Sequence, residues 1–321
     1  MKLIRLDSEQ RLEGVVATVG TFDGLHVGHR AVVGTVQSEA GAEGTSVVVT
    51  FDPHPRSVIS PDSAPRLLTT LDERADVFAR MGVDALAVVE FTQDLRALSP
   101  EQFVDKYLLG FLKVDMLVVG YDHGFGRDRA GDIETIRALG EARGFSVSSV
   151  EPTLIDGDPV SSTRVRRHIE LGEMEAAGRL LGAGYPVSGE VVRGDERGRA
   201  IGFPTANLEV GETKLLPPNG VYAGEARMED GSVGIGVCNL GTKPTFGRND
   251  RTLEVHILDF NREIYGERLT VELSFRLRPE REFETVEDLK TQINQDIVEA
   301  RGRLDGASIP MDAHNRSTDG G

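Results

Sequence analysis

Residues 15–29 read VVATVGTFDGLHVGH, and this stretch decides the fold of the first half of the chain. The apolar residues 15–19 indicate a buried strand, and a glycine-rich turn then leads into a helical pattern over residues 28–40. Backbone N–H groups in such a turn, together with the positive end of the helix, favour a bound anion. The sequence therefore predicts a phosphate site where this strand ends.

The first half of the chain repeats this alternation of strand and helix. Further buried strands are expected at residues 46–51, 85–91, 116–119 and 146–150. Helical periods lie between or after them, at residues 71–81, 100–109, 132–143, 163–171 and 173–181. This order predicts a doubly wound α/β domain over residues 1–184, with ligands beyond the carboxyl ends of its strands.

The second half has a different pattern. Short apolar strands are separated by Gly, Pro and Asn turns, at residues 189–193, 221–227, 233–239, 252–258 and 269–277. They predict a small antiparallel barrel over residues 185–304. One amphipathic helix should cover the barrel through residues at helical spacing, which are Val286, Leu289, Ile293, Ile297, Ala300 and Leu304. Residues 305–321 are polar and without period, and we expect a disordered tail.

The composition narrows the possible partners and the location of the protein. The 321 residues carry 36 Lys and Arg against 52 Asp and Glu, a net charge of −16. Such a field disfavours nucleic acid as a partner. No apolar run approaches the roughly 18 residues of a membrane span, so no membrane partner is expected. The single cysteine, Cys238, fits a reducing, cytoplasmic location. The oligomeric state stays open.

His26 and His29 flank a glycine in the first turn of the predicted helix. Both imidazoles can donate hydrogen bonds to phosphate oxygens, which suits transfer at the α-phosphate of ATP to an attacking phosphate of a second substrate. The same turn supplies further candidate phosphate-binding residues, namely Gly20, Phe22, Asp23, Gly24 and Gly28. One alternative is that both imidazoles are simply surface residues. The other is that they bind a metal, but no Cys or carboxylate lies nearby at the spacing of a zinc site.

Three more loops follow strands of the predicted sheet. Residues 50–55 include Asp52, His54 and Pro55, and residues 120–126 include Asp122. A third loop begins a helix and holds hydroxyls and arginines that can bind a triphosphate, at Ser161, Ser162, Thr163, Arg164 and Arg166. Helix capping alone is the alternative for these hydroxyls.

Residues 20–29, 50–55 and 161–166 together resemble the adenylyltransferase half of bacterial bifunctional riboflavin kinase/FAD synthetases, which belongs to the His-x-Gly-His nucleotidylyltransferases. The resemblance implies a Rossmann-like domain. It assigns ATP binding and activation to His26, His29, Ser162, Thr163 and Arg166, and the active-site loop to Asp52, His54 and Pro55. One position departs from the family. Gly124 stands where the family loop commonly has an arginine, which Arg127 or Arg129 could replace.

Residues 189–208, GEVVRGDERGRAIGFPTANL, form a second distinctive run. Its glycines, Gly194, Gly198 and Gly202, predict a loop that closes over phosphates, with Pro204 at its end. Thr205 and Asn207 alternate on one face of an extended segment and offer neutral oxygens to Mg²⁺. The alternative is a barrel turn in which these residues serve geometry only.

Glu254 lies on a predicted strand whose apolar residues, Leu253, Val255 and Ile257, alternate with it. It is either a solvated residue or a general base that accepts the proton of an attacking hydroxyl. The sequence pattern leaves both open.

The second run, the Glu254 strand, residues 219–222 (NGVY) and residues 239–245 (NLGTKPT) together resemble the riboflavin kinase module. The resemblance implies a six-stranded barrel in which Thr205 and Asn207 bind Mg-ATP and Glu254 is the base. Asn239 would lie in the flavin or active-site loop. The whole chain would then phosphorylate riboflavin to FMN and adenylylate FMN to FAD, releasing pyrophosphate, with ATP as co-substrate in both steps.

Three other functions are alternatives to this one. The barrel could be only a flavin-binding module, which the intact Thr205, Asn207 and Glu254 disfavour. The first domain could act on tRNA, which the net charge of −16 disfavours. The first domain could also act on a different phosphate-bearing substrate, because fold alone does not determine function.

Overall fold

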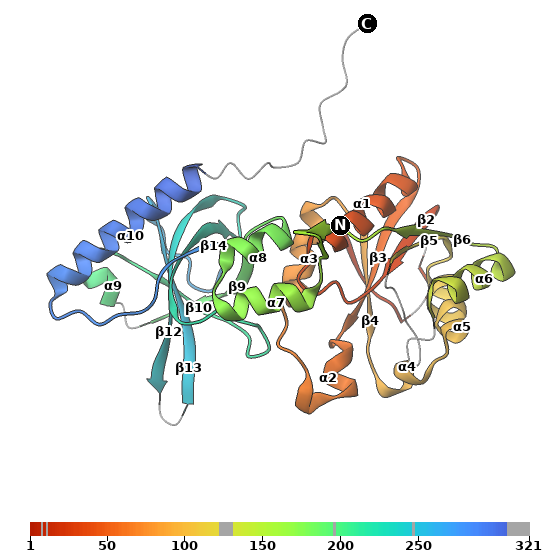
Figure 1. The fold of residues 1–321 in the computed structure, drawn as a ribbon, viewed down its shortest axis with the longest axis horizontal. Helices are drawn as coiled ribbons and strands as arrows, with labels where there is room; N and C mark the ends of the chain where they lie inside the picture. The colour runs from red at the N-terminus through yellow and green to blue at the C-terminus, as the bar shows by residue number, and fades with distance from the viewer. Residues whose placement is uncertain (8, 11, 122–130, 195–196, 246–247, 307–321) are drawn as a thin grey trace, which may run out of the picture. The chain divides into compact units, whose positions relative to one another are not determined.

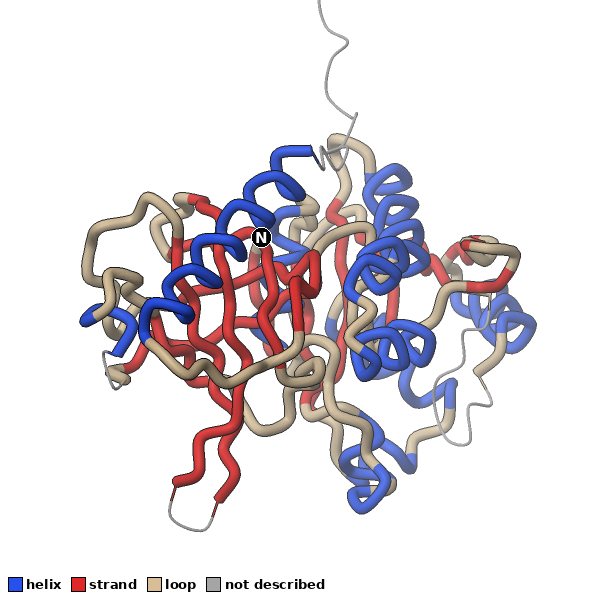
Figure 2. Tube along the Cα trace, turned by 60° about the vertical axis from the view of Figure 1, so that its left-hand side comes forward, coloured by secondary structure: helices blue, strands red, loops and turns tan. Residues whose placement is uncertain are grey.

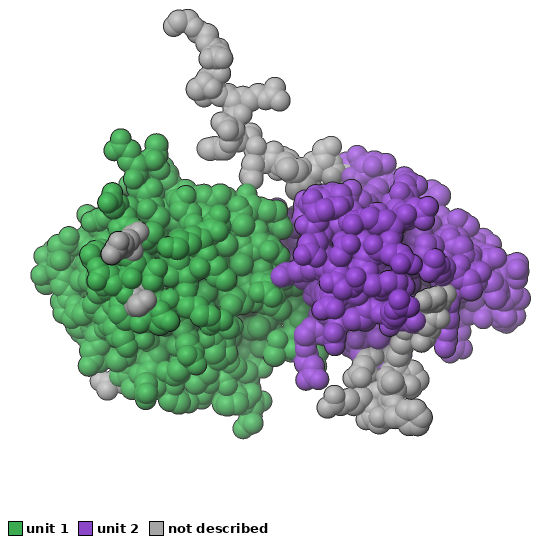
Figure 3. All heavy atoms as spheres, turned by 180° about the vertical axis from the view of Figure 1, so that it is seen from behind, with its two compact units in different colours: residues 1–166, 213–215 green, residues 167–212, 216–321 purple. Residues whose placement is uncertain are grey.

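The structure is a computed structural model that describes residues 1–7, 9–10, 12–121, 131–194, 197–245 and 248–306, with side chains described except at residues 243–250. The chain divides into two compact units (Figure 3). Unit 1 consists of Met1–Arg166 and Thr213–Leu215, and unit 2 of Arg167–Glu212 and Leu216–Gly321.

A parallel sheet forms the centre of unit 1 (Figure 1). Over the described residues it has six strands in the order β1-β4-β3-β2-β5-β6, and each neighbouring pair is parallel. The strands are β1 (Lys2–Arg5), β2 (Val15–Val19), β3 (Thr45–Asp52), β4 (Ala85–Glu90), β5 (Val114–Gly120) and β6 (Ser146–Val150). The predicted Rossmann-like architecture is confirmed, and β1 is an edge strand that the sequence did not reveal.

Helices cover both faces of this sheet because successive strand residues point to opposite sides. Val48 of β3 packs with α1 (Val27–Ala40) and α3 (Leu71–Arg80). Its neighbours Val47 and Val49 pack on the other face. That face is covered by α5 (Pro100–Phe103), the π-helical η2 (Val104–Phe111) and α6 (Ile133–Arg143). The remaining elements are α2 (Pro55–Ile59), η1 (Pro61–Ser63), α4 (Gln93–Ala97), β7 (Leu154–Ile155), β8 (Asp158–Pro159) and α7 (Ser162–Leu171).

The strand order places a topological switch point beside β2. The chain passes from β2 through α1 to β3 on one side, whereas β5 lies on the other side of β2 and leads outward to β6. Ligands of open α/β sheets bind in the crevice that such a reversal leaves beyond the carboxyl ends of the strands. The glycine-rich turn after β2 and the end of β5 both lie at this crevice.

Unit 2 is built on a closed antiparallel barrel. Its strands within the described residues run in the order β10-β13-β12-β11-β14-β9, which confirms the predicted six-stranded barrel. They are β9 (Tyr185–Val192), β10 (Ala206–Glu209), β11 (Gly220–Met228), β12 (Val233–Thr245), β13 (Arg248–Ile257) and β14 (Arg268–Arg278). Helices α8 (Met174–Leu181), α9 (Arg197–Ala200) and α10 (Val286–Gly306) complete the unit.

Helix α10 lies across the barrel strands β12, β11 and β14 (Figure 2). Ile297, Ala300 and Leu304 pack on a barrel cluster that includes Val221 and Val237, as the helical spacing predicted. Val286 is 48% exposed, so the apolar face begins later than expected. A partly buried ion pair also holds the helix, since Arg278 donates to both carboxylate oxygens of Asp296 at 2.8–3.1 Å.

The predicted boundary at residue 184 stays a prediction. Strand β9 begins at Tyr185, but residues 167–184, which include α8, group with the barrel rather than with the sheet. Helix α10 continues to Gly306. Residues 307–321 of the predicted tail lie outside the described residues.

Candidate active sites

The turn after β2 is held in a conformation that glycine alone allows at one position. Gly24 has φ +88°, and a Cβ there would lie 2.7 Å from Cδ1 of Leu68. Asp23 and His26 are buried on either side of it. Gly20 directly follows β2, Phe22 is a buried residue of the turn, and Gly28 is in the first turn of α1. The residues predicted for this loop are thus brought together.

His26 and His29 form one stacked pair, with ring centroids 3.7 Å apart and planes inclined by 15°. His26 caps α1, and its Nδ1 accepts a hydrogen bond from the backbone N–H of His29 at 3.3 Å. Burial lowers the pKa of His26 to about 4 and that of His29 well below its ordinary value. Both rings are therefore neutral near pH 7. Because Nδ1 of His26 accepts, its proton is on Nε2, which is left as a donor.

The start of α7 meets the same turn. Ser162 Oγ donates to the carbonyl of Asp23 at 2.8 Å, and the Arg166 guanidinium donates to the Asp23 carboxylate. Ser161 Oγ accepts from the N–H of Arg164 at 3.3 Å, so it caps the helix. Thr163 beside them is exposed.

Arg164 is placed differently. Its guanidinium donates to the carbonyls of Ile155, Asp158 and Pro159 at 2.8–3.2 Å, bracing the β7–β8 hairpin. Phosphate binding by Arg164 stays a prediction.

The loop after β3 reaches this region as well. His54 caps α2, with its Nδ1 accepting from the N–H of Arg56 at 3.1 Å, and Pro55 is the first helical residue. Burial lowers the pKa of His54, the Asp23 carboxylate opposes this shift, and Arg166 adds to it. Asp52, the last residue of β3, precedes this loop.

Arg74 of α3 ties the two loops together. Its Nη1 donates to the carbonyl of Thr21 at 2.8 Å and to the hydroxyl of Thr50 at 2.6 Å. Sequence reasoning missed Arg74. The available signal was its spacing, since it lies three and four residues before the buried Val77 and Phe78.

A cavity of about 160 Å³ opens beside the stacked histidines. His26, His29, Ser161 and Ser162 line it together with residues at the ends of β5 and β6, which are Gly120, Tyr121, Val150, Glu151, Pro152 and Thr153. Residues 150–153 were not predicted as site residues, although the rule that ligands bind beyond strand ends would have indicated them. The predicted Asp122 lies outside the described residues, as do Gly124, Arg127 and Arg129.

The second site lies on three neighbouring strands of the barrel. In the strand register Glu254 of β13 is opposite Asn207 of β10 on one side and Asn239 of β12 on the other. The Thr205 hydroxyl donates to the Glu254 carboxylate at 3.4 Å. Leu253 and Val255 are buried, so the predicted alternation along β13 is confirmed.

The glycine-rich loop closes on this group. A Cβ on Gly194 would lie 2.3 Å from the side-chain nitrogen of Asn207, so only glycine lets the loop approach so closely. At the other end of the loop, Nδ1–H of His256 donates to the Pro204 carbonyl at 2.7 Å. Gly198 lies in the short helix α9, and Gly202 follows it.

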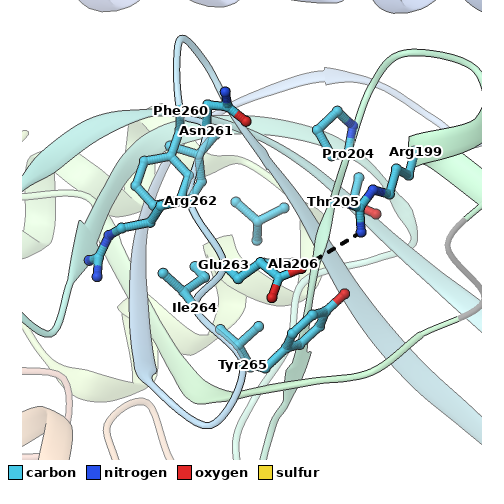
Figure 4. Close-up of a pocket in the computed structure, with 13 residues that line it drawn as sticks. Arg199, Pro204, Thr205, Ala206, Phe260, Asn261, Arg262, Glu263, Ile264 and Tyr265 are labelled. Atoms are coloured by element: carbon cyan, nitrogen blue, oxygen red, sulfur yellow. Dashed lines mark ion pairs between the residues drawn. The ribbon is translucent and has the colours of Figure 1, made fainter.

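A pocket of about 220 Å³ adjoins Thr205 (Figure 4). Arg199, Pro204 and Thr205 line one side, and residues 260–265 wrap around the other. Arg199 and Glu263 form an exposed ion pair at 3.9 Å between the two sides. Sequence reasoning missed residues 260–265, whose signal is a pair of aromatic residues, Phe260 and Tyr265, around a polar run just after a strand.

The oxygen atoms of this barrel site suit a hard divalent cation. Thr205 supplies a hydroxyl and Asn207 an amide oxygen, both ligand types that Mg²⁺ accepts. The described residues include no cluster of three or more His, Cys, Asp or Glu that could hold a metal. A cation here would thus depend on neutral protein oxygens and on substrate phosphates, as Mg²⁺ commonly does with nucleotides.

Comparison with known proteins identifies both halves of the chain. A family model for FAD synthetase matches residues 8–164, and a model for riboflavin kinase matches residues 181–304. A bifunctional riboflavin kinase/FMN adenylyltransferase from Listeria monocytogenes is 41% identical over 89% of this chain and 91% of its own length. The chain belongs to this family. It is therefore a member of a family of bifunctional transferases of flavin cofactor biosynthesis, as the sequence motifs predicted.

Other relatives agree with this assignment. Bifunctional riboflavin kinase/FMN adenylyltransferases from Bacillus subtilis and Escherichia coli are each 38% identical, over 92% and 94% of this chain and 94% and 97% of their own lengths. A solved structure named macrolide-efflux protein, from Streptococcus pneumoniae, has a TM-score of 0.81 at 30% identity and covers 94% of this chain and 99% of its own. In the described part of this chain, no helix is both long enough and apolar enough to span a membrane.

Proposed function

We propose that the barrel converts riboflavin to FMN and that the α/β unit converts FMN to FAD, with one ATP consumed in each reaction. The observation that carries the proposal is the register of Asn207, Glu254 and Asn239 beside Thr205, because it gathers a general base and neutral oxygen ligands at one point of the barrel. The two family matches support both activities on one chain.

In the kinase reaction, the Glu254 carboxylate accepts the proton of the ribityl 5′-hydroxyl as that oxygen bonds to the γ-phosphorus of ATP. The bond from the γ-phosphorus to the bridging oxygen breaks, leaving FMN and ADP. Thr205 and Asn207 would hold Mg²⁺, which neutralises charge on the phosphates. The glycine-rich loop and the pocket lined by residues 260–265 bind ATP, and Asn239 lies on the flavin side.

In the adenylyl transfer, a phosphate oxygen of FMN attacks the α-phosphorus of a second ATP and pyrophosphate leaves. His26 donates through Nε2–H to the phosphates, His29 stacks against it, and the N-terminus of α1 adds a favourable dipole. Because both rings are neutral, this stabilisation is by hydrogen bonds rather than by imidazolium charge. Ser162, Thr163 and Arg166 bind the triphosphate, and the Asp52, His54 and Pro55 loop borders the FMN phosphate.

Two incubations, one supplied with riboflavin and one with FMN, test the proposal. The purified chain is supplied with riboflavin, ATP and Mg²⁺, and the flavins are resolved by chromatography over time. We expect FMN to appear first and FAD to follow, and we expect neither product when a chelator removes the divalent cation. If FMN forms but FAD does not, the assignment of the α/β unit is contradicted. If riboflavin gives no product while supplied FMN is converted to FAD, the assignment of the barrel is contradicted.

A further inference from the structure

Three residues of unit 1 come from between two strands of the barrel. Thr213–Leu215 lie in sequence between β10 and β11, yet they belong to unit 1. They pair with Leu67, whose N–H donates to the Thr213 carbonyl and whose carbonyl accepts from the N–H of Leu215, both at 2.8 Å. Unit 1 is therefore completed by a segment that lies outside its own continuous stretch of chain.

The middle residue of this segment, Lys214, has a fully buried side chain. Its Nζ donates to the Leu68 carbonyl at 2.5 Å and lies 2.6 Å from Oε2 of Glu73, whose side chain is also fully buried. The same Oε2 accepts from the N–H of Thr70 at 2.9 Å, as part of the capping box of α3. A buried ammonium needs such partners, because an unpaired one carries a large desolvation penalty. Lys214 thus fixes the chain on both sides of Thr69.

Thr69 in turn holds the phosphate-binding turn. Its N–H donates to Oδ1 of Asp23 at 2.9 Å, and its hydroxyl oxygen accepts from the N–H of Gly24 at 2.9 Å. Both Thr69 and Asp23 are buried. The remaining groups of Asp23 meet α7, where its carboxylate binds Arg166 and its carbonyl accepts from Ser162. A continuous path of hydrogen bonds, joined by the backbone of residues 68–70, therefore runs from Lys214 to the groups assigned to ATP.

We propose that Lys214 is a positioning residue of the adenylyltransferase site, which sets the turn at Asp23 and Gly24 through residues 68–70. The inference rests on the proposed role of this turn, Ser162 and Arg166 in binding ATP. It goes beyond that role because it gives a residue located between two kinase-barrel strands in the sequence a specific task in the other reaction. The competing explanation is that Lys214 is only a counterion for Glu73.

The test uses the full-length chain with Lys214→Met, which keeps the length of the side chain and removes its charge and donors. We expect kcat/KM for ATP in FAD formation to fall tenfold or more, largely through KM, while riboflavin phosphorylation stays within twofold. Lys113→Met is the matched control, because Lys113 forms an exposed ion pair with Glu9 at the same 2.6 Å. It should leave both activities within twofold.

A second variant separates positioning from charge balance. Lys214→Met with Glu73→Gln removes both buried charges and keeps an oxygen for the capping box. We expect thermal stability to recover towards that of the parent while FAD formation stays at least fivefold low, since the Leu68 carbonyl still lacks its donor. Full recovery of FAD formation would reduce Lys214 to a counterion and overturn the proposal.

The other outcomes are also decisive. Normal FAD formation by folded Lys214→Met, or loss of both activities in both variants, would overturn a role confined to one site. His29→Ala is assayed alongside, so that the underlying assignment is tested separately. If His29→Ala made FAD normally, the assignment of the turn itself would be wrong. If His29→Ala lost FAD formation while Lys214→Met made FAD normally, only the inference about Lys214 would be contradicted.

Discussion

Asn207 and Glu254 face each other in the register of β10 and β13, and the Thr205 hydroxyl donates to the same carboxylate at 3.4 Å. A glutamate on a half-buried strand is usually only solvated. Here the carboxylate has an amide beside it in the register and a hydroxyl within hydrogen-bond distance, while the loop at Gly194 closes on the amide. This arrangement favours the role of general base over that of a solvated surface residue.

Glu254→Gln tests this role directly. The substitution keeps the volume and most hydrogen bonds but removes the ability to take a proton. General-base assistance contributes about 10²–10⁴-fold in rate, so kcat for riboflavin phosphorylation should fall by that order. FAD formation from supplied FMN should be unchanged. The matched control is Glu190→Gln, an exposed glutamate on β9. Near-normal FMN formation by Glu254→Gln would remove this residue from the mechanism.

His29→Ala should separate the two activities. The ring stacks on His26 at 3.7 Å and lines the cavity of unit 1, far in sequence from the barrel residues. Without this ring the His26 donor loses its stacking support, and loss of a positioned donor costs about 10²–10³-fold in kcat at comparable electrostatic sites. FAD formation should therefore fall by up to this order while FMN formation persists. His168→Ala, which removes a histidine bonded to Glu173 on the surface, is the control. A parallel loss of both activities in folded His29→Ala would contradict the two-site assignment.

The sequence predicted most of the fold because its strands are strongly patterned. The run at residues 15–19 is buried throughout, and five of the sheet strands were located from such runs. Strand β1 was missed because only one of its four residues, Ile4, is buried, so its pattern resembles a loop. Strand β10 was recognised only as an extended segment, since four residues leave little room for alternation.

The candidate sites were predictable where short motifs carry the chemistry and not where the fold assembles them. His26 and His29 lie within one motif, and so do Thr205 and Asn207. Arg74 and Lys214 act through tertiary contacts with residues at least 23 and 141 positions away, and no local pattern reports such pairings. Lys214 in particular would be read from sequence as a surface charge, because lysine is almost never fully buried unless it is paired.

The predicted neutrality of the His26 ring can be tested without an activity assay. Burial lowers its pKa from 6.5 to about 4 in the folded chain. Between these values the unfolded chain binds a proton that the folded chain does not, so the contribution of His26 to stability is complete above pH 6.5 and is lost as the pH falls through 4. The shift corresponds to roughly 3 kcal/mol. NMR titration of the His26 ring should show a midpoint near 4, and a midpoint near 6.5 would exclude a neutral donor below neutral pH.

The stability of an isolated kinase fragment should depend on the residue at which it begins. Helix α8 packs against β9 and β14, and its Met174, Leu180 and Leu181 are all buried. A fragment of residues 167–306 keeps this helix, whereas residues 185–304 expose the surface beneath it. Each buried side chain of this size contributes about 1.5–3 kcal/mol, so the longer fragment should unfold at clearly higher urea concentration. Both fragments should form FMN. A folded fragment of residues 167–306 without kinase activity would contradict the assignment of the barrel.

The complementary fragment, residues 1–184, should be unstable because it lacks a residue that unit 1 needs. It contains Glu73 but not Lys214, so a buried carboxylate loses its ammonium partner. Breaking a buried ion pair by removing one partner costs about 3–5 kcal/mol. Glu73→Gln should therefore stabilise this fragment, although the same change should destabilise the full-length chain by leaving Lys214 unpaired. Urea unfolding of the fragment and of the full-length chain, each with and without Glu73→Gln, measures both changes in stability. A fragment that Glu73→Gln fails to stabilise would show that water solvates the carboxylate once residues 213–215 are gone.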